Sequence, residues 1–177
     1  MALLFYLPML AAGVFVRAPG TLRVGDWPRL GLWLALALAA SGGVILLSRA
    51  SRLSAWGQRM AEEFHAVLGG LTAREILWLS LLSAFGEEIL FRGVLHPRIG
   101  LLWAAALFAA VHFPFRRTMW PWTAFAFAMG LGLGWLTDLS GSLWPAILVH
   151  LTVNLFNLHD IVEDSPPGTA GQVGRGA

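Results

Sequence analysis

The stretch GEEILFR, residues 86–92, decides how this chain folds. It places two adjacent carboxylates, Glu87 and Glu88, and the guanidinium group of Arg92 within an otherwise apolar segment. A charged side chain costs at least roughly 2.5 kcal/mol at the centre of a bilayer, so intramembrane charges pair with one another and face the interior of a bundle. The stretch therefore predicts a buried polar site on an apolar helix.

The composition places this helix in a membrane protein. Of the 177 residues, 57% are hydrophobic and 12% are charged, and the mean hydropathy is +0.68. Soluble domains are roughly half apolar and a quarter charged. A membrane span takes about 20 residues, so we expect an all-α, polytopic transmembrane helix bundle of about six spans. Residues 1–160 would form a single transmembrane domain, and the Pro- and Gly-rich residues 161–177 a disordered tail.

The charged residues and the absence of cysteine exclude several classes of function. All twelve basic residues are arginines, the formal net charge is +2, and the arginines are scattered between apolar runs. This pattern is not that of a nucleic-acid-binding surface, so no nucleic-acid partner is expected. Because there is no cysteine, disulfides, thiolate metal sites and cysteine nucleophiles are excluded.

The apolar runs predict the order of the spans. Residues 48–70 differ from the rest, because arginines and glutamates alternate there with apolar residues at helical spacing, which predicts an amphipathic helix in the plane of the membrane interface. Thr72 and Glu75 form a capping-box pattern at the start of the following helix. The small residues Ala126, Gly130 and Gly134 recur every four positions and predict close helix packing. The expected spans are 2–16, 30–47, 72–95, 99–113, 122–136 and a helix opened by Trp144 and Pro145.

Three of these helices each carry a polar residue and a motif partner spaced four apart, which lie on one face of the helix. The residue pairs are Glu88 and Arg92, Phe108 and His112, and His150 and Asn154. A bilayer offers no water to satisfy such groups, so we expect them to converge around a cavity. A carboxylate, two imidazoles, an amide and a guanidinium suit hydrolysis. A glutamate can act as a general base on water, one histidine can hold that water or shuttle protons, and the second histidine with the amide can stabilise an oxyanion, while Arg92 holds the neighbouring carboxylate in place.

The three motifs Glu87-Glu88-x-x-x-Arg92, Phe108-x-x-x-His112 and His150-x-x-x-Asn154 resemble those of the CPBP family. This family comprises CAAX proteases and bacteriocin-processing (Abi) proteins of the glutamic intramembrane protease type, and it includes the type II CAAX prenyl endopeptidases. The resemblance covers residues 72–158. It implies an intramembrane endopeptidase that hydrolyses a membrane-anchored protein or peptide near its C-terminus or its leader.

The resemblance also implies a role for each motif residue. Glu87 and His112 would activate the attacking water, and His150 and Asn154 would stabilise the oxyanion. Glu88 and Arg92 would form a supporting pair, with Phe108 beside the first histidine. No cofactor or metal is expected.

Two alternatives remain open at this point. In the first, Glu87, His112 and His150 form a two-histidine, one-carboxylate zinc site of an intramembrane metalloprotease. In the second, the buried ionisable residues belong to a proton-coupled membrane transporter or to a scaffold. Ser83, one turn before Glu87, is interpreted as a serine that bonds back to its own helix rather than as a nucleophile.

The cellular setting follows from the same features. The chain is small, contains no lysine and has no organelle-type targeting segment, so we expect a multi-pass protein of a prokaryotic cytoplasmic membrane. Its expected partners are the lipid bilayer and a membrane-anchored substrate. The sequence does not indicate an oligomeric state.

Overall fold

The computed structural model describes residue 11 and residues 27–112 and 116–163 of the chain. In this part of the chain all regular secondary structure is helical, which confirms the predicted all-α class. The elements are α2 (Trp27–Ser51), α3 (Ala55–Leu68), α4 (Ala73–Glu88), the π-helix η1 (Ile89–Leu95), α5 (His96–Ile99), α6 (Leu101–Val111), the 3₁₀ turn η2 (Arg117–Met119), α7 (Trp120–Ser140) and α8 (Trp144–Glu163).

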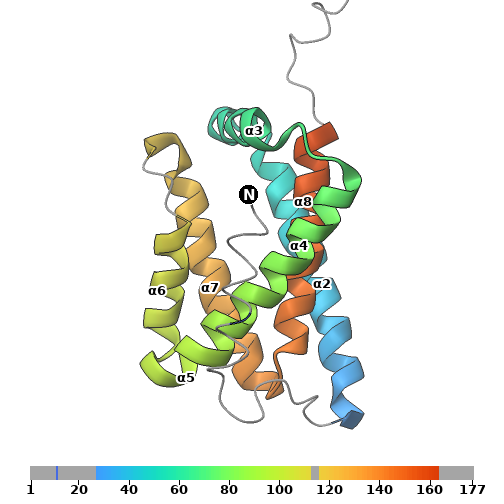
Figure 1. Ribbon diagram of the computed structural model, residues 1–177, viewed down its shortest axis with the longest axis vertical. Helices are drawn as coiled ribbons and strands as arrows, with labels where there is room; N and C mark the ends of the chain where they lie inside the picture. The colour runs from blue at the N-terminus through green and yellow to red at the C-terminus, as the bar shows by residue number, and fades with distance from the viewer. Residues whose placement is uncertain (1–10, 12–26, 113–115, 164–177) are drawn as a thin grey trace, which may run out of the picture.

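The helices form a bundle in which α8 is the central element (Figure 1). It contacts α2 and α4 along their length and also contacts α3 and α7. Helices α6 and α7 pack side by side, and α3 lies across one end of the bundle while α5 lies at the other. A core cluster joins α2, α7 and α8 through Ala37, Ile45, Leu133, Ala146, Val149 and Val153. The bundle therefore holds α4 and α8, which carry most of the predicted polar residues, against each other.

The start of α4 is fixed by the predicted capping box. Thr72 accepts a hydrogen bond from the backbone N–H of Glu75, and the Glu75 carboxylate accepts one from the backbone N–H of Thr72. These two bonds satisfy amides that the first turn of a helix leaves without partners. The predicted opening of α8 at Trp144 and Pro145 is also confirmed.

The far end of α4 differs from the prediction that the helix stops at residues 96 and 97. The chain instead passes through the π-helix η1 into α5, and it turns at Gly100, whose φ of 83° favours glycine. Pro97 lies in the first turn of α5, and it lacks the amide hydrogen that would continue the helical hydrogen bonds of η1. The π-helix closes with the His96 N–H bonded to the carbonyl of Phe91, and such turns are frequent at functional sites.

The small-residue stripe of α7 packs as predicted. Ala126 is 2% exposed, and Gly130 and Gly134 are buried. A Cβ atom added to Gly130 would lie 2.9 Å from the Cβ atom of Ala105 on α6. The absence of a side chain at Gly130 therefore sets the distance between α6 and α7.

Two described helices are long and apolar enough to cross a membrane, Arg29–Ser51 and Trp144–Glu163. A third span results if the bent pair Ala55–Leu68 and Ala73–Ile99, with 106° between its parts, is one span. The six-span count thus stays a prediction, and the predicted first span at 2–16 lies outside the described residues except for residue 11. Helix α8 continues to Glu163 and so includes residues 161–163, which the sequence analysis assigned to the tail; near its end, His159 Nε2 lies 3.3 Å from Glu163 Oε1. Residues 164–177 lie outside the described part.

Candidate active site

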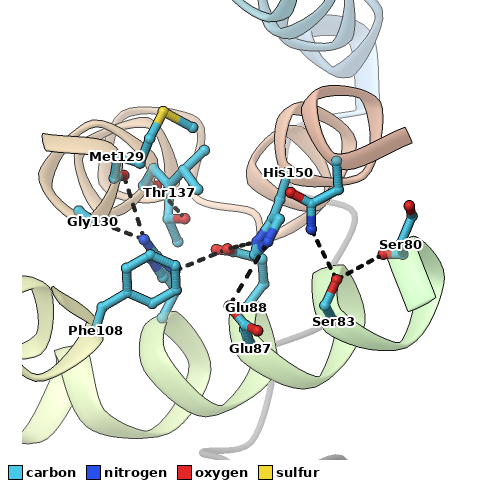
Figure 2. A network of polar contacts seen from close by, with 12 residues as sticks. Ser80, Ser83, Glu87, Glu88, Phe108, Met129, Gly130, Thr137 and His150 are labelled. Carbon is cyan, nitrogen blue, oxygen red and sulfur yellow. Dashed lines mark hydrogen bonds and ion pairs between the residues drawn. The ribbon is translucent and has the colours of Figure 1, made fainter. Parts of the chain in front are cut away.

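Glu87 and Glu88 occupy the last turn of α4, and both are buried, with 4% and 0% of their surfaces exposed. Successive residues of an α-helix point about 100° apart, so the two carboxylates serve different neighbours. Glu88 lies between Arg92 and His150, whereas Glu87 faces His112 and His150. Figure 2 shows both carboxylates beside His150. The site therefore has one carboxylate in a structural network and one directed at imidazole groups.

Glu88 joins three helical elements through one oxygen atom. Its Oε1 atom accepts a hydrogen bond from Arg92 Nη1 (2.8 Å) and one from His150 Nδ1 (2.7 Å). The Nη2 atom of Arg92 donates a hydrogen bond to the backbone carbonyl of Gly130 on α7 (3.2 Å). The predicted pairing of Glu88 with Arg92 is thus present, and its hydrogen bonds reach α7 and α8.

His112 is placed at the end of α6 by its own backbone and by Phe108. Its Nδ1 atom lies 2.7 Å from the carbonyl oxygen of Phe108, and since a carbonyl can only accept, Nδ1 carries the hydrogen. The Phe108 ring lies 4.5 Å from the imidazole ring of His112, centroid to centroid. In the neutral imidazole, the lone pair is therefore on Nε2.

His150, like His112, carries its hydrogen on Nδ1, because that atom also faces a hydrogen-bond acceptor. Its Nδ1 atom donates to the carboxylate of Glu88, which accepts because it is paired with the Arg92 guanidinium. The neutral ring again carries its lone pair on Nε2. Both histidines thus turn an Nε2 atom towards the same carboxylate.

That carboxylate is Glu87. Its Oε2 atom lies 3.7 Å from His112 Nε2 and 3.8 Å from His150 Nε2. It is buried and has no hydrogen-bond partner among the described residues. Three atoms with lone pairs thus face one another at distances too long for direct hydrogen bonds. This spacing suits a bridging molecule that donates hydrogen bonds, such as water.

Asn154 lies one helical turn beyond His150 on α8, and its amide nitrogen donates to the hydroxyl of Ser83 (2.9 Å). Ser83 itself donates to the carbonyl of Ser80 (3.2 Å), as its interpretation as a back-bonding serine predicted. The sequence analysis missed the bond between Ser83 and Asn154. The available indication was the four-residue spacing of Ser83 and Glu87, which places both on one face of α4.

The described residues include no group of three or more histidine, aspartate or glutamate side chains arranged to hold a metal ion. Glu87, His112 and His150 lie close to one another, and both the expected absence of a metal and the zinc alternative stay predictions. We therefore derive no step through a metal.

An apolar groove lies beside His112, between α6 and α7. Its volume is about 660 Å³, and Thr123, one of its lining residues, donates a hydrogen bond to the backbone carbonyl of His112 (3.4 Å). The groove thus brings an apolar surface next to the polar site. The other lining residues are Ala106, Ala109, Ala110, Trp120, Ala124 and Phe127.

Comparisons with known proteins match the part of the chain that carries these residues. Residues 69–156, about half of the chain, match the family model described as type II CAAX prenyl endopeptidase Rce1-like. The chain is also 40% identical over 81 residues to the uncharacterized protein YpbD of Bacillus subtilis (strain 168). The match covers 45% of this chain and 41% of that relative. No solved structure matches the chain.

Proposed function

Because the chain belongs to the Rce1-like family of type II CAAX prenyl endopeptidases, we propose that it is an intramembrane endopeptidase with Glu87 as its general base. The substrate would be a membrane-anchored protein or peptide cut near its C-terminus or its leader. The observation that carries the proposal is the position of Glu87 Oε2, which is buried, unpartnered among the described residues, and faces the Nε2 atoms of both histidines.

In the proposed reaction, a water molecule lies between Glu87, His112 and His150. Glu87 accepts one proton from this water while the water oxygen attacks the carbonyl carbon of the substrate. His112 Nε2 accepts the second hydrogen bond of the water and orients it. When the C–N bond breaks, Glu87 returns its proton to the leaving amine nitrogen.

Charge that develops on the carbonyl oxygen needs hydrogen-bond donors. Asn154 uses one amide hydrogen on Ser83, and the amide has a second one to offer. His150 donates from Nε2 when it is protonated, and the 2.7 Å bond from its Nδ1 to Glu88 stabilises that imidazolium. In this proposal His150 and Asn154 thus both donate hydrogen bonds to the oxyanion.

The apolar groove between α6 and α7 supports a substrate that lies in the membrane. Ala109, Ala110 and Phe127 give it an apolar lining, which suits an apolar anchor whose scissile bond is presented next to His112. We also propose that the chain crosses a prokaryotic cytoplasmic membrane several times, with about six spans and without a bound metal.

The test is the cleavage of a panel of membrane-anchored peptides by the purified protein in nanodiscs. Glu87→Gln keeps the size of the side chain and removes the base, so we expect turnover to fall by roughly 10²–10⁴-fold. Glu62→Gln, at an exposed position of α3, is the matched control and should retain full turnover. Each protein is assayed with and without a strong chelator.

Turnover that is lost in Glu87→Gln and survives the chelator would support a metal-free glutamic protease. Loss of wild-type turnover with the chelator would support the zinc alternative instead. If no peptide is cut while proteoliposomes show a proton flux that depends on Glu87, the protease proposal is wrong and a transporter replaces it.

A further inference from the structure

Besides the Oε2 atoms of Glu87 and Glu88 and the indole N–H of Trp144, two buried polar atoms have no hydrogen-bond partner among the described residues. One is the hydroxyl oxygen of Ser80 on α4, a residue that is 0% exposed, and the other is the side-chain oxygen of Asn157 on α8. A buried polar group without a partner is unfavourable, and native structures usually satisfy it with protein or with an ordered water. Each of these two atoms therefore needs a hydrogen-bond partner that the described residues do not supply.

The register of α4 and α8 places the two atoms at the same level of the bundle. Glu88 bonds to His150, and Ser83 bonds to Asn154, so residue numbers fall along α4 as they rise along α8. Continuing in the same direction, the next residues on the facing sides are Ser80 and Asn157. At about 100° per residue, His150, Asn154 and Asn157 fall within about 60° of one another on α8.

The side of α4 that faces α8 also carries a row of polar residues. Ser80, Ser83 and Glu87 follow one another along the side of α4 that faces α8 (Figure 2). The hydroxyl of Ser83 links the two levels, since it donates to the carbonyl of Ser80 and accepts from Asn154. A continuous polar strip thus runs along the contact between α4 and α8 and ends at Glu87.

The chemistry of the unpartnered pair matches water. The Ser80 hydroxyl can donate and accept, whereas the Asn157 oxygen can only accept. A water between them would donate to Asn157 and accept from Ser80, and buried waters typically have two to four such partners. An apolar side chain in the same place would leave both atoms unsatisfied.

We propose that Ser80, Ser83, Asn154 and Asn157 line a hydrated track that leads water to Glu87 from the end of the bundle covered by α3. This inference rests on the proposed function, because hydrolysis consumes one water for each bond cut and the hydrocarbon core supplies none. Glu87 lies 14 residues beyond the first residue of α4, which is about 21 Å along the helix. Ser80 lies halfway.

The opening of the track lies at a polar end of the bundle. Arg74 and Glu75 in the first turn of α4 are exposed, and α3 crosses the bundle at this end (Figure 1). Between this turn and Ser80, the buried residue on α4 is Ile76, which is 5% exposed. Ile76 is thus the apolar constriction that water passes before it reaches Ser80.

The test uses the absence of native cysteine. In Ser80→Cys, the introduced thiol is the only one, and thiolates react with methanethiosulfonates only where water ionises them. We expect 2-aminoethyl methanethiosulfonate to label Ser80→Cys in liposomes at least about tenfold faster than Val153→Cys. Val153, on α8, is a matched control because it is buried like Ser80 (3% exposed) but lies in the apolar cluster with Ala37 and Leu133. Trp78→Cys, at a half-exposed position on α4, reports labelling from the lipid side.

Asn157→Cys repeats the measurement from α8, so the result does not depend on the folding of one variant. Equal rates for Ser80→Cys, Asn157→Cys and Val153→Cys would overturn the track. The labelling needs no catalysis, so the rates test the track even if no peptide is cut. Fast labelling without any cleavage would therefore count against the proposed function and not against the track. In the cleavage assay, Ser80→Ala should lower kcat and leave KM unchanged, and an unchanged kcat would contradict a role for the track in supplying water.

Discussion

His150 Nδ1 lies 2.7 Å from Glu88 Oε1, so the first polar residue of α8 is bonded to a carboxylate of α4 that lies 62 positions earlier in the chain. The same oxygen accepts from Arg92 at 2.8 Å. One buried oxygen atom therefore fixes the tautomer of a histidine of the candidate site and also pairs with the guanidinium group of Arg92. The stability of the bundle and the geometry of the site depend on the same contact.

Glu88→Ala should destabilise the protein strongly. The change leaves the buried guanidinium of Arg92 without its carboxylate, and removing one partner of a buried ion pair costs roughly 3–5 kcal/mol. The matched control is Asp160→Ala, which breaks the pair between Asp160 and Arg49 (2.7 Å), where the Arg49 side chain is 51% exposed. An exposed pair contributes at most about 1 kcal/mol. Thermal unfolding in detergent measures both, and equal losses for the two variants would contradict the structural role of Glu88.

The contacts within one helix could be predicted from the sequence, because they depend on spacing alone. The pair of Glu88 and Arg92 and the capping box of Thr72 and Glu75 are of this kind, and both are present. The close packing at Gly130 was predictable for the same reason, since a small-residue stripe needs only a neighbouring helix.

The contacts between helices could not be predicted, because helical spacing does not determine the register of two helices. The bond of His150 to Glu88 and that of Asn154 to Ser83 both depend on the antiparallel packing of α4 and α8. The π-helix η1 was missed as well. Its residues have no composition that separates a π-helix from an α-helix, and Pro97 was interpreted as a helix end.

Phe108→Leu should lower activity more than stability. The Phe108 ring packs against the His112 ring and lies 4.5 Å from the Arg92 guanidinium carbon. Its loss should cost about 1–2 kcal/mol of stability, and a displaced His112 should lower kcat about tenfold or more. Phe91→Leu is the control, because Phe91 packs edge-on against Phe108 at 5.0 Å without being a motif residue. A comparable loss of kcat in both variants would show that the effect is structural.

Gly130→Ala should separate α6 from α7. The added Cβ atom would lie 2.9 Å from the Ala105 side chain and 3.0 Å from its Cα atom, and overpacking of this kind costs about 1–3 kcal/mol. Gly132→Ala is the matched control on the same helix, because an added Cβ atom meets no atom within 4 Å there. It should be neutral or stabilising by up to about 1 kcal/mol, owing to the higher helix propensity of alanine. The melting temperatures in detergent give the comparison, and a stable Gly130→Ala protein would contradict the close approach.

Phe64→Ala should show whether the amphipathic helix α3 affects the site. Phe64 packs edge-on against Trp122 at 5.2 Å, and the Trp122 ring lies 5.9 Å from the imidazole of His112. Loss of the Phe64 ring frees Trp122 and loosens His112, so kcat should fall by roughly three- to tenfold. Val67→Ala is the control, since Val67 is on the same helix but is 81% exposed. Because the Val67 side chain is exposed, its truncation should leave kcat unchanged. Equal kcat values for the two variants would show that α3 does not act on His112 through Trp122.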